Sequence, residues 1–407
     1  MYVTPDKCSD ALLMDSFARR WAAKGHDVVV LGSFPHYKMR GIDVMYRGRI
    51  LERERIADRY WIWRTWVYVP RFGWIVERLV NYVSFMLIAL VTATRLRVDV
   101  VHVYAPPPTN GLVGLWMKWV KGARLVYMVQ DVYPDVLIKL GVLRNRLLVK
   151  ILQSIESLYY RVADAVTVIS EGFRRNLARK GVRLEKVHVV PNGADSEFIR
   201  PGKPDTAFRR ELSLGGKFVV MYAGNVGRSQ PVEMLFDVAR SVRHLEDIHF
   251  LVVGAGDRFR ELSEECERLE LKNLSFAPLQ PPERIPEVLA TAAVSLVMLR
   301  PGVAADSIPQ KVYSIMASGR PVIASVDEGS DTWRLVEQIG AGRCVPPEEA
   351  DALSQAVLEL FENREEAVEM GRRGRQYMVE DCGPEAIAEH YLEIFKEVLT
   401  PERSQLR

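Results

Sequence analysis

Short β-branched runs alternate with amphipathic stretches along the chain, and this alternation occurs twice. The first series has candidate strands at residues 27–31, 98–103, 124–128, 165–169 and 187–190. Candidate helices of that series lie at residues 11–24, 110–121, 146–162 and 171–179. Alternation of this kind is typical of a parallel sheet with crossover helices. The first half therefore predicts a Rossmann-like α/β domain.

A second series of strands begins after residue 217. Its candidate strands are 218–222, 249–253, 274–276, 294–298 and 321–323, and its helices are 232–243, 258–269, 282–291 and 311–317. Residues 191–217 are rich in Pro, Gly, Asp and Ser, as expected of an interdomain linker. With 407 residues and 48% hydrophobic residues, the chain can fill two cores. Two doubly wound domains bind their ligands at the carboxyl ends of their strands.

The amino terminus departs from this pattern. A domain of this type normally starts with a strand, whereas the first convincing strand here, 27–31, follows a helix. Residues 1–4 are at best the tail of a first strand. A late start of the chain and a truncated sheet edge both remain open.

Charge and cysteine usage exclude several classes of protein. A net charge of +3 is too small for wholesale nucleic-acid binding. Cys8, Cys266, Cys344 and Cys382 lie far apart, which argues against a zinc site or a disulfide framework and fits a reducing cytosol. No signal-peptide pattern opens the sequence, and its 7 histidines form no ligand spacing. We expect no metal.

Residues 37–97 combine positive charge with aromatic side chains. They contain 12 Lys or Arg against 5 Asp or Glu. Aromatic residues that lie among these charges include Tyr60, Trp61, Trp63, Trp66, Tyr68, Phe72 and Trp74. This mixture suits the headgroup layer of an anionic membrane, and it equally suits a solvated basic face over a partly buried aromatic cluster. The apolar run 85–93 is shorter than the roughly 20 residues needed to span a bilayer, so it is interpreted as a core helix.

Two glycine-rich turns follow strands of the second series. Gly224, Asn225, Gly227 and Arg228 come after strand 218–222, and Gly254 ends strand 249–253. Glycines let the backbone approach a phosphate, and Arg228 adds a charge-assisted contact. A purely structural turn has the same pattern, so these turns alone are weak evidence.

The segment 306–323 is more distinctive. Pro309 and Lys311 open a short helix that contains Ser314 and leads into a buried strand. A helix amino terminus carries partial positive charge, and Lys311 adds a full charge beside it. Together they predict a site for a departing diphosphate. The alternative is a solvent-facing lysine on an ordinary crossover helix.

Several motifs in this order resemble glycosyltransferase family 4, whose members have the GT-B fold. They are residues 129–135 (VQDVYPD), 163–171 (ADAVTVISE), 190–195 (VPNGAD) followed by Phe198, 309–321, 342–346 (GRCVP) and 370–375 (MGRRGR). The resemblance covers nearly the whole chain. Residues 129–135 and 309–321 look like those of bacterial transferases that build surface polysaccharides.

The resemblance implies an α/β protein of two Rossmann-like domains facing each other across a cleft. The acceptor domain would comprise residues 1–198 and 385–407, and the donor domain residues 199–384. The implied activity is a retaining transfer of a sugar from a nucleotide-sugar, by resemblance a UDP-sugar, without a metal cofactor. The basic aromatic region motivates a lipid-linked or membrane-associated acceptor and a peripheral location at the inner face of the cell membrane.

The family's functional residues map onto this chain with departures. The implied catalytic residues are Asp131, Asp306 and Lys311. The implied donor-binding residues are Gly224, Asn225, Gly227, Arg228, Gly254, Ser307, Pro309, Lys311 and Ser314. The family usually has two Glu at the positions of Asp306 and Ser314, an Arg and a Lys at those of Asn225 and Gln230, and a His at that of Gln130. Ser314 lacks the carboxylate that would accept two ribose hydroxyls.

Three other functions compete with transfer. A non-catalytic relative that binds a donor or a partner is the main alternative, because Ser314 replaces Glu. A nucleotide-sugar epimerase needs acid and base carboxylates but no membrane-facing basic region. A dehydrogenase is disfavoured, since no G-x-G-x-x-G follows an early strand with an acidic residue about 20 positions later. His102 either contacts the acceptor or is a satisfied core histidine, the second being favoured.

Overall fold

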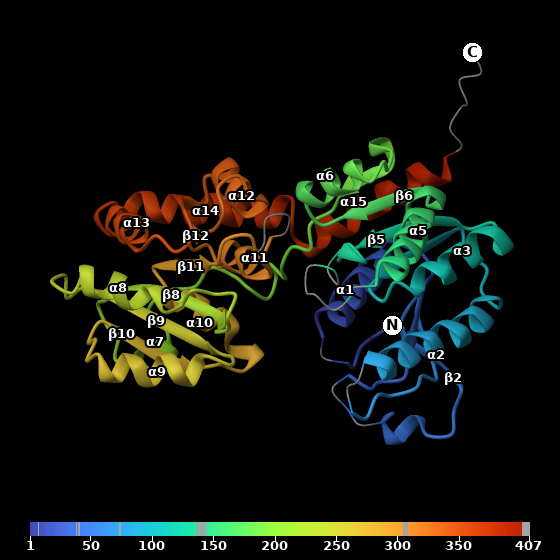
Figure 1. Ribbon diagram of the computed structural model, residues 1–407, viewed down its shortest axis with the longest axis horizontal. Coiled ribbons are helices and arrows are strands. Elements are labelled where there is room, and N and C mark those ends of the chain that lie inside the picture. Colours follow the sequence, from blue (N-terminus) through green and yellow to red (C-terminus); the bar gives the residue numbers. More distant parts are fainter. Residues whose placement is uncertain are drawn as a thin grey trace, which may run out of the picture. The chain divides into compact units, whose positions relative to one another are not determined.

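The computed structural model divides the chain into two compact units. Unit 1 comprises Met1–Pro191 and Ile387–Arg407, and unit 2 comprises Asn192–Ala386 (Figure 1). The structure describes residues 1–6, 8–37, 39, 41–72, 75–135, 138, 143, 145–303 and 308–400. The assignment of residues 1–198 with 385–407 to an acceptor domain, and of residues 199–384 to a donor domain, stays a prediction.

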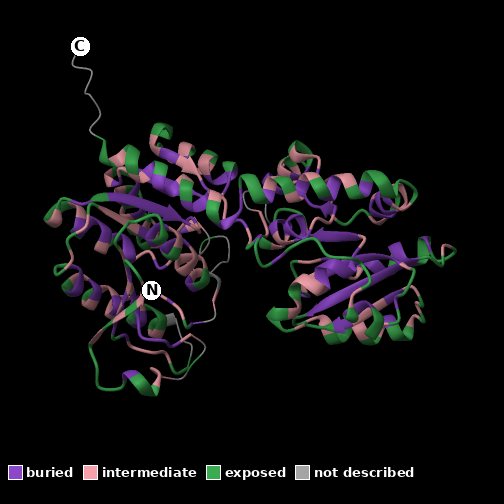
Figure 2. Cartoon of the chain, turned by 180° about the vertical axis from the view of Figure 1, so that it is seen from behind, coloured by how far each residue is buried: buried purple, intermediate pink, exposed green. Residues whose placement is uncertain are grey.

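Unit 2 is built on one parallel sheet. Its strands are β8 (Phe218–Asn225), β9 (Ile248–Ala255), β10 (Leu274–Pro278), β11 (Val294–Met298), β12 (Val322–Ser325) and β13 (Gly342–Val345). They lie in the order β10-β9-β8-β11-β12-β13. This is the doubly wound Rossmann order, which reverses direction between β8 and β11. The sheet is buried and its covering helices expose their outer faces (Figure 2).

Helices cover both faces of this sheet, as parallel sheets require. They are α7 (Ala207–Glu211), α8 (Met234–Ser241), α9 (Phe259–Arg268), α10 (Ile285–Thr291), α11 (Gln310–Ala317), α12 (Asp331–Ile339), α13 (Ala350–Glu362) and α14 (Arg364–Glu380), with a 3-10 turn at Pro282–Arg284. Two separate clusters of buried apolar side chains lie on the two faces. Strand β13 and helices α12, α13 and α14 had not been predicted as elements.

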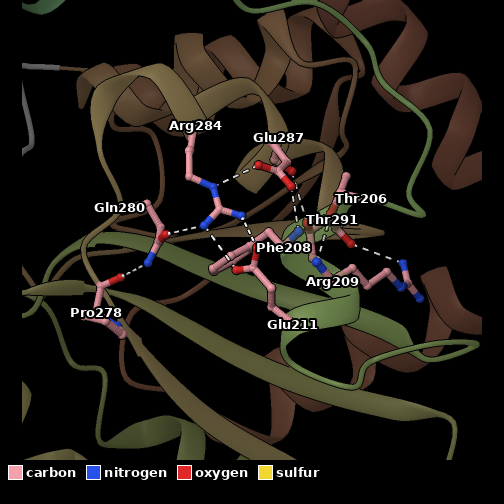
Figure 3. Close-up of polar contacts among 9 residues, drawn as sticks. All are labelled: Thr206, Phe208, Arg209, Glu211, Pro278, Gln280, Arg284, Glu287 and Thr291. Carbon is pink, nitrogen blue, oxygen red and sulfur yellow. Dashed lines mark hydrogen bonds and ion pairs between the residues drawn. The ribbon is translucent and has the colours of Figure 1, made fainter.

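Much of the predicted linker is part of unit 2. Helix α7 lies within residues 191–217 and packs on α10. Around this contact, Arg284 bonds to Glu211 and Glu287, and Glu287 accepts the backbone N–H of Phe208 at 2.6 Å (Figure 3). Phe208 is buried. The Pro- and Gly-rich composition had favoured a linker, but these contacts fix its second half on the unit.

The described residues of unit 1 form two sheets. Strands β1 (Val28–Ser33), β3 (Tyr60–Thr65) and β2 (Leu51–Ala57) form one, in that order, and β4 (Val100–Ala105), β5 (Arg124–Val129), β6 (Ala165–Val168) and β7 (Val187–Val189) form the other. Among the described strands of this unit, β2 alone runs antiparallel to its neighbour. The helices are α1 (Ser9–Ala23), α2 (Ile75–Ala93), α3 (Asn110–Lys121), α5 (Arg146–Val162), α6 (Glu171–Arg179) and α15 (Pro384–Leu399), with 3-10 turns at Val44–Tyr46 and Leu184–Lys186.

The basic aromatic region is only partly a surface. Tyr60 is buried on β3, and Arg53 covers the ring of Trp63 with its guanidinium carbon 4.0 Å from the ring centroid. These contacts favour the partly buried cluster at those two positions, whereas Phe72 is exposed. Trp74 lies outside the described residues.

Helix α2 is longer than the apolar run that predicted it. Within the described residues, it alone is long and apolar enough to cross a membrane, and 28% of its window Val76–Ala93 is buried. The sequence analysis considered the run 85–93 too short to span a bilayer. It missed the first turns of α2, because Glu77 and Arg78 interrupt the apolar residues there. Phe85 and Ala89, one helical turn apart, pack into a core of unit 1.

Candidate functional site

Two glycine turns meet at the carboxyl ends of β8 and β9. Gly224 has a φ of +141°, which favours glycine. A Cβ on Gly254 would overlap the carbonyl oxygen of Gly224, so a side chain there would push the two turns apart. The turns therefore lie side by side next to the point where the strand order reverses.

Lys311 lies against the first turn. Its Nζ is 3.9 Å from the centroid of the Tyr222 ring and 3.0 Å from where a Cβ of Gly224 would stand. The ammonium is buried and has no hydrogen-bond partner within the described part of the chain. Burial lowers its pKa to about 8. The alternative of a solvent-facing lysine is thereby wrong.

The chain after β8 is held by polar contacts. Asn225 Nδ2 donates to Gln230 Oε1 at 3.2 Å, and the Tyr222 hydroxyl donates to the Asn225 carbonyl at 2.6 Å. A Cβ on Gly227 would lie 2.7 Å from Asn225 Nδ2, so this turn is also tight. Gln230 thus orients the amide of Asn225 at the edge of the site.

Arg228 extends from the same turn into solvent. Its side chain is 89% exposed, and its Nε lies 3.6 Å from Asp257 Oδ2. An exposed pair of this kind contributes little to stability. Arg228 is therefore able to leave Asp257 for an incoming anion at small cost.

Arg300 fixes the backbone of this turn and was missed by the sequence analysis. Its Nε donates to the Arg228 carbonyl at 2.8 Å, and its backbone N–H donates to the Ser229 carbonyl at 3.0 Å. Its guanidinium also pairs with Glu233 and Glu348. The available signal was its position just after strand 294–298, at the carboxyl edge where ligands bind.

Helix α11 presents its amino terminus on the same side as Lys311. Pro309 is the N-cap residue and supplies no side-chain cap, and the first amides of a helix lack intrahelical acceptors. Ser314 lies one turn further on, where its hydroxyl donates to the Gln310 carbonyl at 3.5 Å. Asp306 and Ser307 lie outside the described residues, so their predicted roles are not placed.

The structure thus brings together Gly224, Asn225, Gly227, Arg228, Gly254 and Lys311, with Pro309 and Ser314 on the helix that carries the lysine. Asp131 belongs to unit 1, where it follows β5 and is half-buried. Burial and the neighbouring Asp10 carboxylate raise the pKa of Asp131.

His102 does not fit the favoured interpretation of a core histidine whose hydrogen bonds are all made. Its ring packs against Trp21, Tyr391 and Phe395, but its Nε2 has no hydrogen-bond partner among the residues the structure describes. Burial lowers its pKa to about 4, so it is neutral at pH 7.

Metal ligands do not gather in the described ranges. No group of three or more His, Cys, Asp or Glu there could hold a metal ion. That a metal is not needed stays a prediction.

A Rossmann strand order with a buried, unpaired ammonium and glycine turns at the switch point defines a nucleotide-binding α/β unit. Similarity to known protein families supports this class. The Glycosyl transferase 4-like domain matches residues 14–193, and the Glycosyl transferases group 1 domain matches residues 204–377. The chain belongs to the glycosyltransferases of family 4, with the GT-B fold.

Individual relatives are similar over most of their length. The chain is 28% identical to a putative colanic acid biosynthesis glycosyl transferase, WcaI, of Escherichia coli over 82% of this chain and 83% of the relative. It is 27% identical to the probable glycosyltransferase WbjE of Pseudomonas aeruginosa over 69% and 70%. Among solved structures, Anabaena Alr3699/HepE in complex with UDP matches with a TM-score of 0.71, 16% identity and 98% coverage of both chains. At that identity the match supports the fold alone.

Proposed function

We propose that this glycosyltransferase moves a sugar from a UDP-sugar to a lipid-linked or membrane-associated acceptor in surface-polysaccharide synthesis, with retention of configuration. The buried, unpaired ammonium of Lys311 is the observation that carries the donor part of the proposal. Such a charge interacts strongly with a diphosphate because the surroundings are poorly polarisable. The relative in colanic acid biosynthesis supports the choice of pathway, and the UDP bound by the structural neighbour motivates the choice of nucleotide.

In this mechanism the donor diphosphate lies between the glycine turns and the amino terminus of α11. Lys311 and Arg228 neutralise the charge that develops on the leaving diphosphate. Asn225 and the Gly227 backbone hold it in place, with Gly254 allowing close approach. The acceptor attacks from the face on which the diphosphate leaves, and a diphosphate oxygen takes its proton. The family resemblance assigns Asp306 and Ser307 to the sugar, and Asp131 to orienting the acceptor.

Calorimetric titration with UDP and with GDP tests the donor site. UDP should bind the natural chain, and Lys311→Ala should weaken it roughly 10- to 100-fold, because a hydrogen bond to a charged group contributes about 1.5–3 kcal/mol. Lys272→Ala is the matched control, since Lys272 is exposed just before β10, at the amino end of the strand. Failure of both nucleotides to bind would overturn the proposal.

Exposed apolar side chains on α2 and α3 support the acceptor part. The two helices pack against each other. Their exposed apolar side chains are Val76, Leu79, Val80, Leu87, Val91, Leu112, Trp116, Trp119 and Val120. Arg78, Arg95 and Arg97 are exposed near the ends of α2. Exposed tryptophans beside arginines suit the headgroup layer of an anionic membrane.

The non-catalytic alternative is favoured by one residue. Ser314 stands where the family has Glu, and its hydroxyl contacts its own helix. Incubation with UDP-sugars and lipid-linked acceptors separates the two functions. Release of UDP with formation of a glycosylated lipid, whose anomeric configuration is read by NMR, supports transfer. UDP binding without turnover supports the alternative.

A further inference from the structure

One arginine side chain joins three loops at the carboxyl edge of the unit 2 sheet. Arg300 follows β11, and its Nε donates to the Arg228 carbonyl at 2.8 Å, while its two terminal nitrogens pair with Glu233 and Glu348. Glu233 lies at the start of α8, and Glu348 lies between β13 and α13. These contacts fix the plane of the guanidinium, so Arg300 is placed to orient protein groups rather than to bind a ligand itself.

The same contacts belong to a chain of alternating charges. Glu233 uses its second carboxylate oxygen to pair with Arg258, which follows β9, at 2.8 Å. The backbone N–H of Arg258 donates to the Val226 carbonyl, beside the first glycine turn, at 3.2 Å. Together with Arg300 and its two glutamates, Arg258 completes a chain of four side chains. This chain links the loops that follow β8, β9, β11 and β13.

Glu348 has an unfavourable backbone conformation at the end of this chain. Its φ is +60°, in the left-handed region that residues with a Cβ seldom adopt. Such strain persists where surrounding contacts over-determine it, and it concentrates at ligand sites. The ion pair of Glu348 with Arg300 is partly exposed and contributes little to stability by itself. Stability alone is therefore a poor reason for keeping Glu348 in this conformation.

Arg300 holds the backbone that carries Arg228. Besides bonding to the Arg228 carbonyl, it donates its own backbone N–H to the next carbonyl, that of Ser229, at 3.0 Å. Because peptides are planar, these two bonds orient two successive peptide groups, the first of which begins at the Cα of Arg228. The Arg228 side chain is 89% exposed, and its contact with Asp257 is long, at 3.6 Å. Its direction therefore depends mainly on the backbone that Arg300 holds.

We propose that Arg300 is a positioning residue for donor binding, which directs Arg228 toward the donor diphosphate and is itself held by Glu233 and Glu348. The inference rests on the proposed function, because it assumes a diphosphate at this turn. It adds that affinity for the diphosphate depends on a side chain that does not contact it. The loop between β13 and α13 thereby acts on the donor site through Glu348.

Calorimetric titration of the full chain with UDP tests this role by a double-mutant cycle. Arg300→Met keeps much of the apolar stem but removes the guanidinium, and we expect it to weaken UDP binding about tenfold. Arg228→Ala should weaken binding by at least as much. Adding Arg300→Met to Arg228→Ala should then cause little further loss, because the effect of Arg300 acts through Arg228.

Arg343→Met is the matched control for stability. Arg343 also bridges two carboxylates, those of Glu359 and Glu366, and its side chain is 30% exposed, against 32% for Arg300. It lies near the amino end of β13, away from the carboxyl edge. We expect both substitutions to lower the melting temperature by similar amounts, but only Arg300→Met to weaken UDP binding.

Two milder variants separate charge from geometry. Arg300→Lys keeps the charge without the guanidinium fork, so it should restore the melting temperature more than the UDP binding. Glu348→Gln leaves Arg300 in place but loosens it, and it should weaken UDP binding by a smaller factor than Arg300→Met. Because Glu348 is exposed, this variant tests the proposal even if Arg300→Met does not fold.

Several results would overturn the proposal while leaving the donor site intact. They are unchanged UDP binding in Arg300→Met and Glu348→Gln, an equal loss of binding in Arg343→Met, full recovery of binding in Arg300→Lys, and an undiminished effect of Arg300→Met when residue 228 is already Ala. Failure of UDP to bind the natural chain would instead overturn the proposed function, and this inference with it.

Discussion

Lys311 keeps its charge where burial opposes it. Its pKa is lowered from 10.5 to about 8 in the folded chain, so between these values the unfolded chain binds more protons than the folded one. Stability therefore rises with pH across this interval. Below pH 8 the folded state bears the full cost of the buried ammonium, up to about 3 kcal/mol. A site that binds an anion gains from this arrangement, because the anion relieves the cost.

Replacing the charge should make the free protein more stable and less able to bind. Lys311→Met keeps the length and the apolar stem of the side chain, and we expect it to raise the free energy of unfolding at pH 7 by up to about 3 kcal/mol. The gain should shrink as the pH rises from 8 to 10.5. Urea denaturation at pH 7 and at pH 10, with UDP titration alongside, measures both effects. An equal or lower stability at pH 7 would contradict the assignment of a strained charge.

Ser314 offers a test by restoration of the family's residue. Ser314→Glu introduces the carboxylate that would accept the two ribose hydroxyls, and we expect it to tighten UDP binding about 5- to 10-fold. The control ligand is 2′,3′-dideoxy-UDP, which lacks both hydroxyls. Calorimetry should find no gain with that ligand. A gain of the same size with both ligands would mean that the carboxylate acts elsewhere.

Local sequence signals predicted part of this residue set. The glycine turns and Lys311 follow strands or open a helix, so their positions could be predicted from short windows. The contact of Lys311 with Tyr222 could not be predicted, because it depends on α11 returning over β8 from far along the chain. Arg300 was missed for the same reason, since its partner Arg228 lies on a different loop.

At the scale of elements, the exposed side chains of α2 and α3 determine which surface would contact a membrane. Trp116→Ser together with Trp119→Ser should reduce binding to vesicles of phosphatidylglycerol and phosphatidylcholine severalfold, because interfacial tryptophans are lost. Leu279→Ser together with Val368→Ser is the control, because both side chains are exposed apolar residues of unit 2. Co-sedimentation at low and high salt measures the change. If the natural chain failed to sediment at low salt, the membrane partner would lose its support.

Strands that form short apolar runs in the sequence were predicted, whereas β2 and β3 were missed. All ten predicted strands correspond to strands in the structure, most within two residues of their ends. Strands β2 and β3 were missed because their aromatic and basic residues were interpreted as a surface. The pattern was nevertheless present: Tyr60 and Ile62 are buried, while Trp61 and Trp63, which alternate with them, are less so. Period two is the mark of a strand with one buried face.

At the scale of the molecule, the helix α15 ties the carboxyl terminus to unit 1. Trp21 Nε1 donates to the Ala388 carbonyl at 3.0 Å, and Tyr391 packs with Phe17 and Trp21 in a buried cluster. The return of this helix was implied by the family resemblance, since its amphipathic pattern alone names no partner. The two-domain organisation, in contrast, follows from the repeated alternation of strands and helices.

Two units with separate cores should respond separately to mutation and to ligand. Tyr391 is fully buried in unit 1, and Phe250 is fully buried in unit 2. Tyr391→Ala should destabilise unit 1 by about 3–5 kcal/mol, and Phe250→Ala should destabilise unit 2 by a similar amount. UDP at 100 times its dissociation constant should stabilise unit 2 alone, by about 2.7 kcal/mol.

Differential scanning calorimetry of both variants, with and without UDP, distinguishes these effects. In Tyr391→Ala an early transition should be insensitive to UDP and a later one should move upward with it. In Phe250→Ala the early transition should be the one that UDP raises. A single transition that UDP shifts equally in both variants would mean that the units unfold together, because a coupled molecule distributes the binding energy of one unit over both cores.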